Sequence, residues 1–395
     1  MTEHAATLQP TRHDVRWVRI LYLFYIGGTG FLFPFWGLFL RRQGLTGTEI
    51  GFISTVMSTA ILLAATGWGR LSDRSQSPKR VIQVALLMGA GMTLVLRFQS
   101  GFWPLLIAGG LYGAAIAGIQ PMLYALAYDL TERLPSIGFG SIRVWGSIGW
   151  VVMVLVSGWA IERADLSFGF YGQTVAFLLT TAAVFYVRFS PQREEEESES
   201  NVQLRAALNR DLLFLAAAIS VGWMARVGPI RFEGIYLEEL GAGEFLIGVA
   251  SMVGAVVEIP AMFLADRLVS RHSYLRILRI CFVIELIVQG SILLRPAVAT
   301  IVLVRGLGGL SFSLYSVALV GVVGRLVPEK TIGAMLALFT ITLPSLMEII
   351  GSPLTGLAFD RLGAYWLYAI ALGCNAGAFV LLNGVRTRSK RGARA

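Results

Sequence analysis

Charged residues are scarce in this chain, and cysteine is nearly absent. Only 14% of the 395 residues are Asp, Glu, Lys or Arg, whereas 55% are hydrophobic, and the mean hydropathy is +0.68. This composition excludes a soluble globular domain and indicates a membrane protein. The two cysteines, Cys281 and Cys374, lie in apolar segments, so we expect packing roles and no disulfide.

Histidine is also missing from the predicted membrane segments, and the sequence lacks the common nucleotide-binding and metal-binding motifs. The histidines are His4, His13 and His272, and all fall in segments expected to be cytoplasmic, which excludes an imidazole proton relay inside the membrane. The sequence offers no phosphate-binding loop with a lysine and no metal-ligand cluster. We therefore expect no enzymatic activity, no cofactor and no metal. Period-two alternation is weak, which argues against a β-barrel.

Long apolar runs dominate what is present. A spanning helix needs roughly 20 apolar residues, and twelve segments come near that length: 17–40, 50–71, 81–96, 103–127, 142–161, 170–187, 212–237, 245–265, 275–294, 301–323, 332–354 and 364–382. The first follows Arg12 and Arg16 without a small-residue cleavage site, so it is interpreted as a retained helix rather than a signal peptide.

Basic residues predict the orientation. Most of the 33 Lys and Arg fall in the tails and in the loops that lie on the same side as both termini. The positive-inside rule then places both termini in the cytoplasm of a multi-pass inner-membrane protein. This explains the net charge of +9 without nucleic-acid binding, although the basic tail could also touch anionic lipid of the bilayer.

One fifteen-residue pattern occurs twice, which indicates an internal duplication. Gly37, Gly44 and Gly51 are matched 197 positions later by Gly234, Gly241 and Gly248. We predict an N-terminal six-helix bundle over residues 1–190, a cytoplasmic linker over 191–210 that contains a run of four glutamates, and a C-terminal six-helix bundle over 211–395. The glutamate run is interpreted as solvated linker, with a calcium or partner site as the weaker alternative.

The loop after the second segment carries the first family signature. It contains Gly69, Asp73 and Arg74, and its counterpart after the eighth segment keeps Asp266 and Arg267. The loop resembles the signature cytoplasmic loop of the major facilitator superfamily, although the usual second glycine is absent. The resemblance implies that these five residues form a conformational gate. The alternative is ordinary positive-inside loop charge.

Residues 139–150 resemble the start of helix 5 in the branch that contains the lactose permease, phenylpropionate transporters and nucleoside symporters. The resemblance assigns Arg143 and Trp150 to solute contact, and their seven-residue spacing puts them on one helix face. The carboxylate residue with which helix 4 of the permease binds the sugar corresponds to Ala125 here, so galactoside recognition of the known kind is in doubt. Asp129, one turn further on, could pair with Arg143 or mark the helix end. Alternatively, Arg143 caps the helix and Trp150 packs against apolar neighbours.

Four charged residues in the second half are expected to serve proton coupling. Glu258 lies in a stretch resembling the permease's helix 8, which joins solute binding to coupling, or else forms a permanent salt bridge. Glu285, Arg305 and Glu348 lie inside apolar segments and need partners. Because the permease's histidine and glutamate beyond Arg305 are replaced, carboxylates must carry any transported proton. If none does, the protein is a uniporter.

The seventh segment carries Arg226, Arg231 and Glu233 around Gly228–Pro229. We predict a helix that is broken there and lines a cavity, with Arg226 either paired to Glu233 or, like Arg231, binding an anionic solute. The first segment is expected to be interrupted at the matching place, between the glycines of residues 27–30 and Pro34. Trp36, which corresponds to Glu233 in the repeat, completes the candidate solute-contacting residues.

These observations favour an all-α, twelve-helix major facilitator fold of two pseudo-symmetric bundles that works by alternating access, as a monomer. The leading interpretation is proton-coupled symport of a small polar or aromatic organic solute such as a sugar, a nucleoside or an aromatic acid. Proton-driven efflux of drugs or metabolites on the same fold is the second interpretation, and a non-transporting sensor or scaffold is the third.

Overall fold

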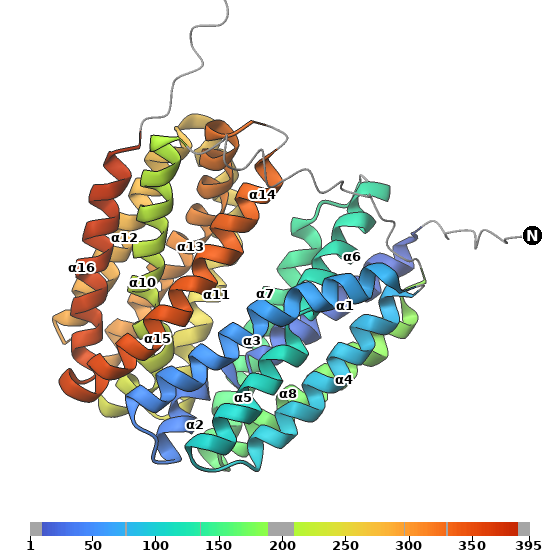
Figure 1. The fold of residues 1–395 in the computed structure, drawn as a ribbon, viewed down its shortest axis with the longest axis horizontal. Helices are drawn as coiled ribbons and strands as arrows, with labels where there is room; N and C mark the ends of the chain where they lie inside the picture. The colour runs from blue at the N-terminus through green and yellow to red at the C-terminus, as the bar shows by residue number, and fades with distance from the viewer. Residues whose placement is uncertain are drawn as a thin grey trace, which may run out of the picture. The chain divides into compact units, whose positions relative to one another are not determined.

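The computed structural model describes residues 10–75, 77–134, 136–188, 209–295, 297–328 and 331–385. These residues form a succession of helices (Figure 1). In the first half they are α1 Arg12–Thr29, η1 Phe33–Phe35, α2 Trp36–Arg42, α3 Gly47–Arg74, α4 Pro78–Arg97, α5 Phe102–Ile116, α6 Ile119–Arg133, α7 Gly140–Arg163 and α8 Ser167–Tyr186. In the second half they are α10 Arg210–Glu239, α11 Glu244–Arg271, α12 Tyr274–Leu293, α13 Val298–Leu326, α14 Ile332–Ala337, the π-helical η3 Leu338–Thr342, α15 Leu343–Leu362 and α16 Ala364–Asn383. The predicted linker lies outside the described residues except for residues 209 and 210.

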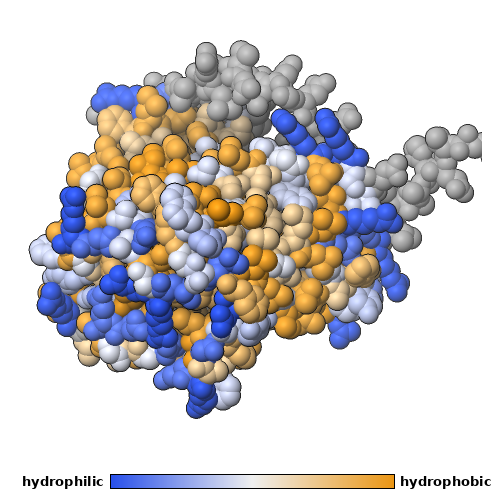
Figure 2. Space-filling model, turned by 60° about the horizontal axis from the view of Figure 1, so that its bottom comes forward, coloured by the Kyte–Doolittle hydropathy of each residue, from blue (hydrophilic) through white to orange (hydrophobic). Residues whose placement is uncertain are grey.

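Eleven helical stretches of the described chain are long and apolar enough to cross a membrane. One more helix, α12, completes the set of twelve and is the ninth crossing along the chain. It carries Arg276, Arg279 and Glu285 among its apolar residues. Large apolar side chains are exposed on the helices, including Leu63, Phe185 and Leu303 at 70%, 74% and 73%, and hydrophobic residues cover much of the face in Figure 2. Exposed apolar surface on this scale suits contact with lipid. The all-α fold with twelve membrane crossings is therefore confirmed.

The chain divides into two compact units. Unit 1 comprises Met1–Glu195 together with Leu237–Met252, and unit 2 comprises Glu196–Tyr236 together with Val253–Ala395. The end of α10 and the first part of α11 thus belong to the second half by sequence but to unit 1 by packing.

In unit 1, α1 packs against α7 and α8, α3 packs against α5, and α4 packs against α5 and α8. The fourth crossing is interrupted between α5 and α6, where the Trp68 indole of α3 donates a hydrogen bond to the carbonyl of Ala114 at 2.8 Å. A Cβ at Gly118 would lie 2.4 Å from the Cβ of Trp68. The interruption and the missing side chain at Gly118 therefore make room for the Trp68 side chain between α5 and α6.

The sequence repeat produces the same turn twice. Gly44 and Gly241 have φ values of 81° and 86°, which glycine adopts without the steric cost that a Cβ would bring. The Gly44 N–H donates to the carbonyl of Arg41 and the Gly241 N–H to that of Glu238, each at 2.9 Å. In both copies the next residue donates back to the carbonyl five positions earlier, which completes the helix-ending Schellman motif.

The two expected helix interruptions have different outcomes. The first crossing is broken between α1 and α2, as predicted. The seventh is not, because α10 continues through Pro229 to Glu239. The prediction of a broken seventh helix was therefore wrong. A proline removes only one backbone donor, and the remaining hydrogen bonds of a thirty-residue helix hold the helix together on both sides.

In unit 2, α12 packs against α13 and α16, and α15 packs against α16. The core of this unit is built from apolar side chains of α10, α12, α13, α14, η3 and α16, among them Leu215, Leu278, Val322 and Phe339. This packing fixes α10 at its Leu212–Ile219 end, directly before the turns that carry its charged residues.

Candidate functional site

A narrow pocket in unit 2 surrounds Arg226 of α10. Arg226 lies 3.8 Å from the carboxylate of Glu285 on α12, and its guanidinium is 5.6 Å from the ring of Trp223 and 5.8 Å from that of Phe312. The remaining walls include Tyr315 and the buried Asn375. A planar cation between aromatic rings, beside a carboxylate, can bind a hydroxyl pair or an anionic group.

The pocket is small in this conformation. The cavity has a volume of about 20 Å³, whereas one water molecule needs roughly 10 to 15 Å³. An organic solute must therefore bind beside this pocket or enlarge it. The Arg226–Glu285 separation exceeds the 3.2 Å that limits most N–H···O hydrogen bonds. The two charges attract each other without being locked together.

Two further ion pairs join α10 to other helices of unit 2. Arg231 donates to Glu348 of α15 at 2.6 Å, and Arg305 of α13 donates to Glu233. Arg231 is almost fully buried, with 6% of its side chain exposed, against 34% for Glu348. Buried charges persist in a membrane protein only when they are paired or face a polar cavity. The sequence-based expectation that Glu285, Arg305 and Glu348 need partners is confirmed.

The partners differ from those expected along the helix. Arg226 and Glu233 share a face of α10, which predicted that they pair with each other. Arg226 instead faces Glu285, and Glu233 accepts from Arg305. A pair between neighbouring helices satisfies both charges and also fixes the helix packing. Thus α10 connects α12, α13 and α15 through three separate charges.

Glu258 lies on α11 and is half-buried. The backbone carbonyl of Glu258 accepts a hydrogen bond from the Ser313 hydroxyl of α13 at 3.1 Å. The close approach of these helices also appears at Gly309, where a Cβ would lie 2.0 Å from the carbonyl oxygen of Gly254. The carboxylate is therefore held on a helix that is tightly packed against the one carrying Arg305.

The candidate residues of unit 1 make contacts within their own unit. Arg143 donates to the Ser147 hydroxyl at 3.3 Å, and Trp150 meets Phe33 edge to face at 5.9 Å between ring centroids. Asp129 accepts from Arg133, one turn along the same helix, at 3.0 Å. Trp36 is 6% exposed and packs in an aromatic cluster with Phe39 and Phe170.

The candidate gate is partly described. Asp73 and Arg74 end α3 and are exposed, and Gly69 has no atom within 4 Å of where a Cβ would stand. Asp266 and Arg267 lie on α11, and their side chains are outside the described part of the structure.

Several contributors to the pocket were not identified from the sequence. Trp223 stands three residues before Arg226, so it shares that face of α10. Asn375 is a polar residue inside an apolar run, a signal that could have identified it. Tyr315 carries no such signal, because aromatic residues are common on lipid-facing and core surfaces alike. Among the residues the structure describes, no group of three or more His, Cys, Asp or Glu residues is arranged to hold a metal.

Comparison with known proteins extends over most of the chain. Residues 15–370 match the model of the MFS_1 like family. The maltose permease of Geobacillus stearothermophilus is 24% identical over 327 residues, covering 81% of this chain and 82% of the relative. Sugar efflux transporter A of Dickeya chrysanthemi is 27% identical over 334 residues, covering 80% and 81%. The crystal structure of the nucleoside transporter NupG superposes with a TM-score of 0.74 at 14% identity, covering 94% of this chain and 98% of that one.

Proposed function

Because this chain belongs to the MFS_1 like family and is thus a multi-pass membrane transporter rather than an enzyme, we propose that it couples movement of a small polar or aromatic organic solute to movement of protons. Alternating access of the solute site to the two membrane faces is the mechanism. Both termini are cytoplasmic in this proposal, and one copy of the chain carries out transport.

The Arg226–Glu285 pair carries the proposal. It lines a pocket of aromatic and amide side chains inside the membrane, and its charges are 3.8 Å apart. A guanidinium held this loosely can turn to a solute hydroxyl or carboxylate. When it does so, the Glu285 carboxylate loses part of the positive charge that faces it, and in this proposal the transported proton takes that place. Solute binding and proton binding then favour each other, which is the requirement for symport.

The other carboxylates have distinct roles. Glu233 and Glu348 hold arginines of unit 2 in hydrogen-bonded pairs, so they keep α10 in register with α13 and α15. Glu258, on the helix packed against α13, is the second candidate proton carrier, as its resemblance to the helix 8 glutamate of the permease implies. Arg143 and Trp150 of unit 1 are further candidates for solute contact, as the resemblance to the helix 5 region of the permease implies.

The test uses purified protein in proteoliposomes with an imposed pH gradient and labelled maltose, uridine and 3-phenylpropionate. We expect accumulation of at least one solute inside vesicles when the outside is acidic, with matching proton entry. Glu285→Gln and Glu258→Gln should each abolish accumulation and retain solute exchange at zero gradient, because the amide can still bind polar groups but cannot release a proton. Full accumulation by either variant contradicts the coupling role of that residue.

The same vesicles decide the direction. Sugar efflux transporter A shows that a relative of similar identity is named for export. Proton-driven extrusion of a sugar or of a lipophilic cation, with no gradient-driven uptake, would replace symport by efflux. Absence of flux for every solute would leave a sensor or scaffold role.

A further inference from the structure

The two copies of the sequence repeat end in opposite charges. The first copy leads into Arg41–Arg42 and the second into Glu238–Glu239, at the same position of the pattern. By chain topology these residues follow the first and seventh crossings, and Glu162 ends the fifth. An odd number of crossings places all of them on the membrane side opposite the N-terminus.

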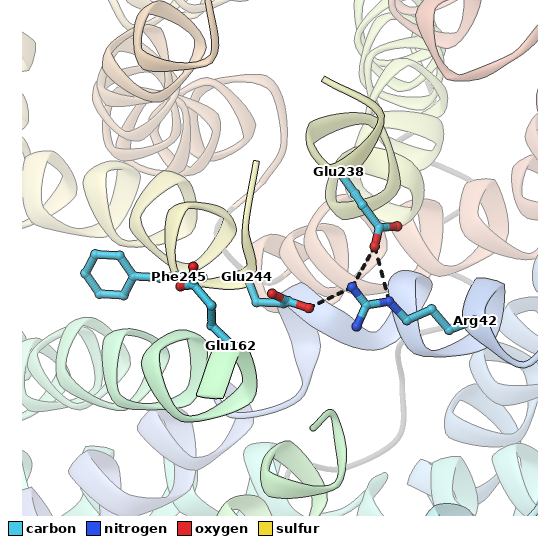
Figure 3. Close-up of polar contacts among 5 residues, drawn as sticks. All are labelled: Arg42, Glu162, Glu238, Glu244 and Phe245. Carbon is cyan, nitrogen blue, oxygen red and sulfur yellow. Dashed lines mark hydrogen bonds and ion pairs between the residues drawn. The ribbon is translucent and has the colours of Figure 1, made fainter. Parts of the chain in front are cut away.

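The structure brings these charges into one network within unit 1. The Nη2 atom of Arg42 lies 2.6 Å from Glu238 and 2.7 Å from Glu244, and its Nε donates to Glu238 at 3.2 Å (Figure 3). One guanidinium therefore holds both ends of the loop between α10 and α11. These two ion pairs hold the loop between α10 and α11 against Arg42, at the end of the first crossing.

A second contact fixes the start of α11 on α7. The Glu162 carboxylate accepts a hydrogen bond from the Phe245 N–H at 3.2 Å (Figure 3). The first N–H groups of a helix have no partner within the helix, and a carboxylate there is also favoured by the helix dipole. Glu162, which belongs to α7, thus stabilises the N-terminus of α11.

Glycines let the backbones of α7 and α11 approach closely beneath this network. A Cβ at Gly158 would lie 2.8 Å from the carbonyl oxygen of Glu244, and one at Gly248 would lie 2.9 Å from that of Val154. Backbone atoms on both sides leave no flexible side chain to move aside. Any larger residue at Gly158 or Gly248 must separate the two helices.

The charged contacts are of a strength that can be broken and remade. The side chains of Arg42 and Glu238 are 42% and 37% exposed, whereas Glu244 is 15% exposed. Ion pairs exposed to solvent contribute little to stability. Such a network shifts the balance between two conformations without making one of them permanent.

We propose that Arg42, Glu162, Glu238 and Glu244 form a reversible latch that closes the solute path on the side opposite the chain termini, and that Gly158 and Gly248 set how tightly it closes. The proposal rests on the alternating access proposed above. Opening on this side requires the segment Leu237–Met252 to leave the first half of the chain. In the present structure the latch is closed.

The experiment measures opening directly in the full-length protein, with Cys281→Ser and Cys374→Ser to remove native thiols. Spin labels on Gln43→Cys and Leu240→Cys, one on each loop of the repeat, report their separation in lipid nanodiscs by pulsed electron resonance. We expect one short distance without further change. Arg42→Glu should raise the long-distance population at least threefold, because it places a third carboxylate beside Glu238 and Glu244.

Restoration separates a latch from general damage. Combining Arg42→Glu with Glu238→Arg and Glu244→Arg should return the short distance, since the charges are exchanged. Gly248→Leu should open the latch with all charges intact. Arg97→Glu, a charge reversal at the end of α4 on the same membrane side, is the matched control and should change nothing.

An unchanged distance in Arg42→Glu, or a failure of the exchanged variant to return the short distance, overturns the latch. If Arg42→Glu does not fold, Arg42→Gln with the same labels decides, and it should give a smaller rise in the long-distance population. An unchanged distance in Arg42→Gln also overturns the proposal. The readout needs no solute, so a protein that transports nothing would count against the proposed function and not against the latch.

Discussion

Units 1 and 2 distribute their ion pairs differently, although the sequence repeat gives both halves of the chain the same turn. Unit 1 carries ion pairs at helix ends, as in the Asp129–Arg133 pair within α6 and the Arg42 network after α2. Unit 2 carries them inside the membrane crossings, where α10 is joined to α12, α13 and α15. Among the residues that the structure describes, the ion pairs that join helices inside the membrane crossings thus lie in unit 2.

Removing the buried arginine of unit 2 should have the largest effect. Arg231→Met leaves Glu348 without its hydrogen-bonded cation and should lower the free energy of unfolding by about 3 kcal/mol. The double variant Arg231→Met with Glu348→Met should regain most of this loss. In unit 1, Arg42→Met removes the exposed pair with Glu238 and should cost about 1 kcal/mol. Thermal unfolding in detergent measures all three, and equal losses for the two single variants would erase the contrast between the units.

Glycine variants should show where the units behave alike. Gly309→Ala in unit 2 and Gly149→Ala in unit 1 each place a Cβ close to a carbonyl oxygen, at 2.0 and 2.2 Å. Overpacking of this kind costs roughly 1 to 3 kcal/mol, so both should lose about 2 kcal/mol. The control is Gly290→Ala, which meets no atom within 4 Å and should slightly raise the melting temperature. A loss in only one unit would show that the close crossings are not equivalent.

Solute binding should show the smallest difference, and it compares the two arginines proposed to contact solute. Lysine keeps the charge but loses the planar fork of donors. Arg226→Lys should weaken the binding of the transported solute about tenfold, or about 1.4 kcal/mol, because this side chain lies in the pocket. Arg143→Lys should weaken it about half as much in free energy, since Ser147 already takes one of its donors. Equilibrium binding to detergent-solubilised protein tests both. Unchanged affinity in Arg143→Lys would return that residue to the role of a helix cap.

The fold could be predicted from the sequence because the membrane and the duplication constrain it strongly. Apolar length marked the crossings, and the repeated glycines at 44 and 241 became the same turn in each copy. The interruption of the first crossing at Pro34 was also correct. Pro229 misled because a proline inside a long helix is tolerated when the flanking turns are well packed.

The site was harder to predict, for a reason of geometry. Spacing along one helix shows which residues share a face, but it does not show which neighbouring helix presents the opposite charge. Glu285, Arg305 and Glu348 could be recognised as needing partners, whereas the pairing of Arg226 with Glu285 depends on how α10 and α12 are aligned. The polar Asn375 and the indole of Trp223 join the site only through that alignment.

Because α10 is one continuous helix, it joins the Arg226 pocket rigidly to the loop that follows Glu239. Glu233, paired with Arg305, and Glu238, held by Arg42, are five residues apart on one helix, a rise of about 7.5 Å. A helix with a break at Pro229 would bend between the Arg226 pocket and the membrane surface and would absorb a displacement of either end. A continuous one carries a tilt or rotation at Arg226 to the loop at Glu238 as mechanical strain on the Arg42 contacts. In the proposed transport mechanism, α10 alone connects the pocket at Arg226 to the Arg42 contacts, with no relay of side chains between them.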